Sequence, residues 1–349
     1  MSPDTRPRPA LIAIGHRVAV PVAPRTVRVG VLLVGLLLVV AVLTFTLGRL
    51  GIPLGELPGA LLNGAEGKNG FVLETLRGPR FIVAVGTGVA LGISGALFQS
   101  VTRNPLGSPD VIGVAAGAGA GAALFGLLIP GAIPVWLGAL IGSVAAIVLV
   151  AASTGAGFAN PGRMILAGIG VSAMAVAFSQ YVVFVVARDR AAVLQAYLNG
   201  SLNSRSWEHA TMIWIVVACC IVPLALLVSR LAVTEMGDEM AESLGAGPRA
   251  TRRWAVIISV ALAAAAVTVA GPIAFVALTA PHIARRLARS PLPQITLSAL
   301  VGALLLCVAD VVAEQVGWFD GLPVGILTLG IGGIYLGFLL VREWKKGTL

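Results

Sequence analysis

The sequence predicts an all-α membrane protein of about ten transmembrane helices, and three observations point to this class. Hydrophobic residues make up 58% of the 349 residues and charged residues only 11%, whereas charged residues form about a quarter of a soluble domain. Apolar stretches of about twenty residues, the length that a helix needs to cross a ~30 Å hydrocarbon layer, recur along the chain. The basic residues stand in ones to threes between these stretches, so they indicate topology rather than a nucleic-acid surface.

The stretch 76–121 is the part around which the chain is organised. It predicts two helices, 81–101 and 111–129, joined by the polar hinge 102–110. Neither helix contains a charged residue or a histidine, and the short hinge requires the two to run antiparallel. Glycines recur in both helices, which allows close contact between helix backbones in lipid. We therefore expect a tightly packed bundle.

The remaining elements follow in order. Residues 1–28 hold five arginines and five prolines without an apolar period, which favours a flexible basic cytoplasmic arm. A single transmembrane domain, 29–349, follows. Its predicted spans are 29–47, 81–101, 111–129, 135–152, 164–186, 211–231, 254–270, 273–288, 295–316 and 322–341. A short surface helix is expected in the polar segment 188–209.

The distribution of basic residues predicts the orientation. An even number of spans places both termini on one side, and that side holds most of the 24 Lys and Arg residues. The other side holds only Arg49, Lys68, Arg77, Arg80, Arg188, Arg190 and Arg205. Cytoplasmic loops carry the excess of Lys and Arg, so both termini are predicted to be cytoplasmic.

Arg77 and Arg80 are unusual because they lie on the outer side, at the start of a helix, where the helix dipole disfavours cations. One interpretation is that their side chains extend to lipid headgroups. The other is that the two guanidinium groups, spaced three residues apart around Pro79, face carboxylates of an external partner. We favour the second.

The longest charged connection, 234–253, is predicted to be a docking element. Met236, Met240 and Leu244 fall at helical spacing, which indicates a short amphipathic helix before the next span. The alternative is a solvated loop. The residues expected to form a coupling contact with a cytoplasmic partner are Gly237, Met240, Glu242, Leu244, Gly245, Gly247 and Arg249.

A second cytoplasmic segment, 155–163, is rich in glycine and proline. Such a segment can rearrange its backbone with little steric strain. We expect an inner gate there, and its candidate residues are Gly155, Asn160 and Pro161.

An enzyme is not the preferred interpretation. The sequence Gly92-Ile93-Ser94-Gly95 matches the GxSG pattern of intramembrane serine proteases, which need a histidine base beside the serine. The candidates, His209 and His282, are not expected to reach Ser94. The chain shows no nucleotide-binding loop, HExxH motif or Cys/His cluster, so we expect no directly bound cofactor, no metal and no catalytic residue.

Several segments together resemble the permease subunits of ATP-binding-cassette (ABC) importers for ferric siderophores, haem and cobalamin. They are LRGPR, GALFQSVTRNPLGSPDVIGVAAGAG, AESLGAG, VAGPIAFVALTAPHIARRL, LCVAD and LPVGILTLGIGGIYL. The resemblance covers nearly all of the chain from Leu76 onward. The ending GGIYLGFLLVRE is similar to one half of a heterodimer in catechol-siderophore importers, which favours a ferric siderophore over haem or cobalamin.

The resemblance implies a ten-helix subunit of the bacterial inner membrane. Its expected partners are a second permease subunit, two cytoplasmic ATPases that hold ATP and Mg²⁺, and an external binding protein. It further implies that Arg77 and Arg80 meet glutamates of the binding protein and that 237–253 is the coupling element. Some members have a further arginine after the Ala-Asp pair, where this chain has Glu314.

An ion-driven secondary transporter is the remaining alternative. Such a protein should bury titratable groups near the middle of the membrane to bind its coupling ion. The predicted spans are nearly free of such groups. Asp310 is the exception, and its place in the span puts it nearer the outer interface.

Overall fold

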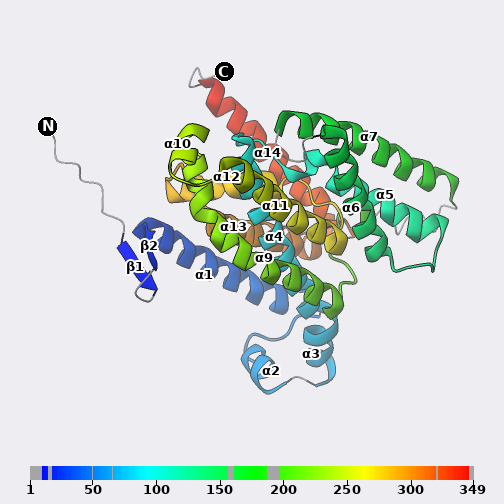
Figure 1. The fold of residues 1–349 in the computed structure, drawn as a ribbon. Coiled ribbons are helices and arrows are strands. Elements are labelled where there is room, and N and C mark those ends of the chain that lie inside the picture. The colour runs from blue at the N-terminus through cyan, green and yellow to red at the C-terminus, as the bar shows by residue number, and fades with distance from the viewer. Residues whose placement is uncertain are drawn as a thin grey trace.

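The computed structural model describes residues 10–14, 18–48, 50–64, 66–155, 161–186, 197–319 and 321–345. Within these ranges it confirms an all-α membrane fold (Figure 1). Seven helices are long and apolar enough to cross a membrane, and two shorter apolar helices accompany them. The bundle helices are α1 (Pro24–Thr46), α4 (Arg77–Thr102), α5 (Val114–Ala123), α6 (Val135–Thr154), α7 (Pro161–Val185), α9 (Trp207–Thr234), α11 (Pro248–Ala270), α12 (Val276–Ala288), α13 (Ile295–Gln315) and α14 (Val324–Lys345). Each predicted span corresponds to one of them.

Short elements lie at the two ends of the bundle. Figure 1 shows α2 (Leu57–Asn63) and α3 (Gly67–Phe71) at the end opposite to α10 (Asp238–Ser243). A π-helical turn, Val72–Leu76, leads from α3 into α4, and a 3-10 turn, Gly317–Phe319, follows α13. Residues 188–196 of the segment expected to form a short surface helix lie outside the described ranges, and its last residues, from Trp207, begin α9 (Trp207–Thr234).

The amino-terminal region differs from the expected arm. Strands β1 (Ala10–Ile14) and β2 (Val18–Val22) form an antiparallel hairpin in which Ala10 pairs with Val22. Helix α1 begins at Pro24, five residues before the predicted span. Proline suits the first turn of a helix because its missing N–H would have no partner there.

Helix α4 forms the centre of the bundle, in agreement with the role expected for stretch 76–121. It packs against α9, α11, α12 and α13, and most of its residues are buried. A Cβ atom added at Gly88 or Gly92 would overlap the backbone of α13, and one added at Gly95 would overlap the carbonyl of Ala277 in α12. The glycines therefore let the helix backbones touch, as expected for packing in lipid.

Two predicted spans are interrupted. The span predicted at 111–129 is a 3-10 turn (Pro109–Ile112), then α5, then a π-helical turn (Leu124–Leu128). Gly113, between the first two, has φ = +90°. Helix α12 starts only at Val276, because Gly271 and Phe275 take left-handed backbone conformations with φ of +76° and +67°. Periodicity in the sequence cannot show such breaks, since the side chains remain apolar across them.

Candidate functional site

Arg77 joins three helices at the end of the bundle where α1 finishes. Its Nη1 donates hydrogen bonds of 2.7 Å to the carbonyl oxygens of Thr44 and Leu47, and its Nη2 lies 3.0 Å from a carboxylate oxygen of Glu314 in α13. The last carbonyls of a helix lack partners within the helix and form its negative end. Arg77, which is 3% exposed, therefore caps α1 from within the protein.

Arg80 lies one turn further along α4 and pairs with a second carboxylate of α13. Its Nε and Nη2 donate to both carboxylate oxygens of Asp310, the shortest of these bonds being 2.7 Å. Asp310 is buried. Because Asp310 and Glu314 are four residues apart, they occupy one face of α13, and that face meets the arginines of α4.

The guanidinium groups of Arg77 and Arg80, which the sequence predicts to meet carboxylates of an external partner, are bound here by carboxylates of α13, and docking of an external partner by them stays a prediction. Both groups face inward and are engaged by α13, which is more than 200 residues away in the sequence. Glu314, noted from the sequence only as a departure from the related family, is the partner of Arg77. Asp310 is bound by Arg80 rather than open to a coupling ion, so the geometry does not favour the secondary-transporter alternative.

The opposite end of the bundle holds the arginines of α11 and α12 and is called the basic end below. At this end Asp238 connects three elements. Arg103, the residue that ends α4, donates to the carbonyl of Thr234 at 2.7 Å and to Oδ1 of Asp238 at 2.6 Å. Arg252 of α11 donates to the same oxygen. The hydrogen bond from Arg252, and then the pairing with Arg103, hold the pKa of Asp238 below its usual range. Helix α10 is thus tied to both α4 and α11.

The predicted coupling residues lie in and around α10: Met240 and Glu242 are within the helix, Gly237, Leu244, Gly245 and Gly247 flank it, and Arg249 belongs to α11. Gly237, Gly245 and Gly247 have φ of +118°, +74° and +55°, conformations that favour glycine and that place sharp bends on both sides of the helix. Glu242 and Arg249 are exposed.

The apolar edge of α10 faces away from the bundle. Met236, Met240 and Leu244 are 70%, 52% and 62% exposed. Met236 and Met240 also border a groove of about 690 Å³ beside Arg103 and Asp238. Exposed apolar side chains grouped in this way are typical of surfaces that bind a partner.

Sequence reasoning missed a further polar link at the basic end. Gln99 of α4 donates to the carbonyl of Leu278 at 2.9 Å and accepts a 2.8 Å bond from Arg285 of α12. Nδ1 of His282 lies 2.6 Å from the Tyr335 hydroxyl of α14. Gln99 is the one amide side chain in the predicted span 81–101. A polar side chain at that place in an apolar span is the signal that could have predicted a polar contact there.

Ser94 is a packing residue in this structure. Its Oγ donates to the carbonyl of Ser259 at 2.5 Å, and Oγ of Ser259 donates back to the carbonyl of Ser94 at 2.8 Å. This reciprocal pair joins α4 to α11 in the core. The hydroxyl that a serine protease would use is therefore bonded to α11 and not to a histidine.

The predicted gate is described only at its edges. Gly155 ends α6 with φ = +66° and has open space around it, and Pro161 begins α7. Asn160 lies outside the described residues.

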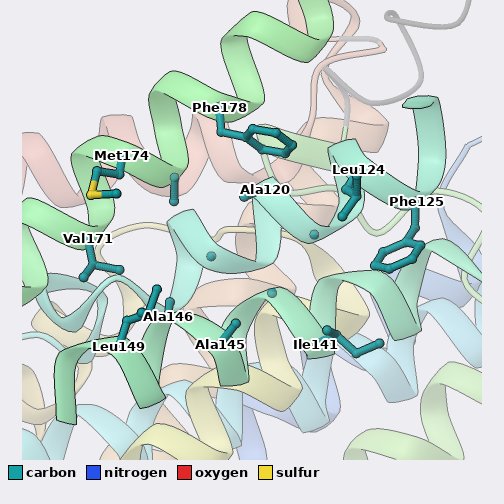
Figure 2. A pocket seen from close by; sticks show the side chains of 14 residues that line it. Ala120, Leu124, Phe125, Ile141, Ala145, Ala146, Leu149, Val171, Met174 and Phe178 are labelled. Atoms are coloured by element: carbon teal, nitrogen blue, oxygen red, sulfur yellow. The ribbon is translucent and has the colours of Figure 1, made fainter. Parts of the chain in front are cut away.

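An apolar groove of about 320 Å³ lies among α5, α6 and α7. Figure 2 shows Leu124 and Phe125 above Ile141 and Ala145, with Met174 and Phe178 from α7 closing the other side. All side chains of its lining are apolar, so the groove offers no fixed polar contact that could orient a chelate.

The structural comparison supports the same fold. A solved inward-facing structure described as a metal-chelate type ABC transporter aligns with a TM-score of 0.78 at 24% identity, over 91% of this chain and 99% of the other. PsaBC from Streptococcus pneumoniae, solved with a Fab, aligns with a TM-score of 0.51 at 15% identity, over 76% and 90% of the two chains.

The sequence comparisons place the chain in a family. It is 38% identical to the ferric enterobactin transport system permease protein FepG of Escherichia coli over 86% of this chain and 91% of the relative. It is 35% identical to the Fe(3+)-citrate import system permease protein YfmE of Bacillus subtilis over 89% and 96%. Residues 36–342 match the FecCD transport family. On these matches and its bundle of apolar helices, the chain belongs to the FecCD transport family.

Proposed function

We propose that this chain is the membrane-spanning permease subunit of an ABC importer that moves a ferric siderophore across the bacterial inner membrane. The relatives named as permeases for ferric enterobactin and ferric citrate match it over nearly their whole length, which supports this substrate class over haem or cobalamin. The chelate is cargo, and ATP with Mg²⁺ is used by separate ATPase subunits.

The observation that carries the proposal is helix α10. It projects at the basic end, displays Met236, Met240 and Leu244, and is held to α4 and α11 through Asp238. An apolar helical edge of this kind fits a groove on a partner. ATP-driven movement of that partner would push α10, and the ion pairs would pass the displacement to α4 at the centre of the bundle.

The remaining partners follow from the same assignment. A second permease subunit, in a heterodimer by preference, completes the pathway, and an external binding protein delivers the chelate at the end that carries α2 and α3. The basic end and both termini then face the cytoplasm, in agreement with the distribution of Lys and Arg. The segment 155–163 lies on the same side and is the proposed inner gate.

The test is Leu244→Asp, compared with Leu62→Asp. Both leucines are exposed, but Leu62 lies on α2 at the other end of the bundle. An unpaired carboxylate in a buried contact should cost a few kcal/mol. We expect Leu244→Asp to insert normally, to lose co-purification with the ATPase and to stop uptake of iron from a ferric siderophore, whereas Leu62→Asp keeps its ATPase. Normal assembly and transport by Leu244→Asp would exclude α10 as the coupling element.

Substrate class is tested separately. Cells that depend on this importer should take up labelled iron supplied as a ferric catecholate siderophore, and neither labelled haem nor labelled cobalamin at the same concentration. Uptake of haem or cobalamin without iron-siderophore uptake would reassign the cargo within the family.

A further inference from the structure

Helix α12 is joined to α4 through one amide side chain at the basic end. Gln99 of α4 is 2% exposed. Its Nε2 donates to the carbonyl of Leu278 at 2.9 Å, and its Oε1 accepts from Nη2 of Arg285 at 2.8 Å. Because one bond needs an amide donor and the other an amide acceptor, together they fix the orientation of the amide. Gln99 lies one turn before Arg103, the residue that ends α4, so α4 contacts α12 next to the place where it contacts α10.

Helix α12 also holds α14 by two contacts about one helical turn apart. Nδ1 of His282 lies 2.6 Å from the Tyr335 hydroxyl, and the two rings meet edge to face. One turn further along α12, the guanidinium carbon of Arg286 lies 5.8 Å from the centre of the Phe338 ring, a distance at which a cation is attracted to the ring face. Tyr335 and Phe338 are three residues apart, so they occupy one face of α14.

Arg285 connects these contacts with the segment that precedes α10. Glu235, the residue that follows α9, interacts electrostatically with Arg285 and with Arg103. Tyr335 of α14 also interacts electrostatically with Arg285. Glu235 stands three residues before Asp238, the first residue of α10. A chain of polar contacts therefore runs from α10, through the end of α4 and through α12, to α14.

The backbone allows α12 to shift as a short unit. The helix has 13 residues. It follows Gly271 and Phe275, and it ends at Arg289; all three take left-handed conformations, with φ of +76°, +67° and +51°. Residues at the ends of an element can absorb the change of backbone angles when that element moves. Helix α14 packs against α12 and α13, while Ile331 and Ile334 on its other sides are exposed.

We propose that Gln99, Arg285 and His282 are positioning residues that transmit a displacement of α10 to α14. The proposal rests on the function proposed above, because the ATPase is what moves α10. Arg103 shifts the end of α4, Gln99 carries α12 with it, and the contact of His282 with Tyr335 moves the basic half of α14. Hydrogen bonds are directional, whereas apolar packing is not, so these contacts keep the helices in register as they move.

The test is a distance measurement in the assembled importer. Spin labels are attached to Ile334→Cys on α14 and to Val148→Cys on α6, both exposed positions, in a chain without its three native cysteines. We expect ATP with vanadate to change the distance between the labels. Tyr335→Phe, which removes only the hydroxyl, should lose this change and keep its ATPase. Tyr181→Phe, at an exposed tyrosine of α7, should keep both.

Hydrogen–deuterium exchange of the full chain in detergent tests the contact between α12 and α14 without ATP. Tyr335→Phe should raise amide exchange in residues 332–338 about five-fold, the factor that corresponds to the loss of one neutral hydrogen bond, and Tyr181→Phe should not. Gln99→Leu breaks only the link to α4. It should therefore leave this exchange unchanged and still lose the distance change that ATP produces.

The outcomes separate this proposal from the proposed function. If Tyr335→Phe binds its ATPase and keeps the full distance change, the transmission route is wrong and the proposed function stands. The same holds if the unmodified importer hydrolyses ATP without any change between the labels. Unchanged exchange in Tyr335→Phe, or loss of its ATPase, would also overturn the route, because the hydroxyl would then not hold α14 or would serve assembly. If the unmodified chain binds no ATPase, the proposed function fails and the route fails with it.

Discussion

The side chains of Arg80 and Asp310 illustrate how a charge can be tolerated inside a membrane bundle. Two donors of the guanidinium meet both oxygens of the carboxylate, so each charge is neutralised and hydrogen-bonded where water is excluded. Such a pair adds little stability compared with two apolar residues, but breaking it leaves one uncompensated charge.

This argument predicts the effect of removing one partner. Arg80→Met should destabilise the protein by about 3–5 kcal/mol, because Asp310 stays buried without its cation. The double variant Arg80→Met, Asp310→Leu should recover most of the loss. Thermal unfolding in detergent measures both. If Arg80→Met keeps the parental stability and only capture of the binding protein falls, Arg80 is a docking residue after all.

Among the helices, α10 is held in place by ion pairs, and the apolar side chains in and beside it are not buried against the bundle. Ion pairs between half-exposed groups contribute only about 0.2–1 kcal/mol each, so the contacts of Asp238 with Arg103 and Arg252 are too weak to hold the fold together. They do fix where α10 lies relative to α4 and α11. We therefore expect a change at Asp238 to affect coupling more than stability.

Asp238→Asn should accordingly leave folding and ATPase co-purification intact but reduce the amount of iron-siderophore transported per ATP hydrolysed. Glu239→Gln is the matched control, since Glu239 is the next residue of the same helix. The measurement is the ratio of transport to ATP hydrolysis in proteoliposomes. If Asp238→Asn keeps the same ratio of transport to ATP hydrolysis as the unmodified protein, the ion pairs do not transmit the movement of α10.

The same carboxylate predicts a pH dependence. Because the arginines lower the pKa of Asp238 in the folded state, its stabilising contribution is complete above the unfolded value of about 3.9 and is lost as the pH falls through the lower folded value. The distance between spin labels placed on α10 and α4 should therefore stay the same from pH 5 to pH 8 and change only in stronger acid. A change in this distance near pH 6 would point to another group.

For the whole molecule, packing density depends on the glycines between α4 and α13. A Cβ atom at Gly92 would overlap the carbonyl of Ser298, whereas Gly170 of α7 has open space around it. Overpacking of a core costs about 1–3 kcal/mol. We expect Gly92→Ala to lose at least that much stability, while Gly170→Ala is neutral or slightly stabilising because alanine favours helix. Equal melting temperatures for the two variants would contradict the packing argument.

The sequence alone determined the spans, their approximate limits and the asymmetry of basic residues. Each depends on a local quantity: about twenty apolar residues are needed to cross the hydrocarbon layer, wherever the neighbouring helices lie. The exposure of Met236, Met240 and Leu244 was also predictable, but the single helix expected to carry all three is shorter: α10 spans Asp238–Ser243, and Gly237, with φ = +118°, separates Met236 from it.

Only the tertiary structure decided what the charged residues do. Arg77 and Arg80 pair with Glu314 and Asp310, which the sequence could not show because these partners are more than 200 residues away and no local pattern links them. The late start of α12 likewise depends on left-handed backbone conformations at Gly271 and Phe275. Contacts between helices depend on which faces meet, and that is a property of the assembled bundle rather than of any one segment.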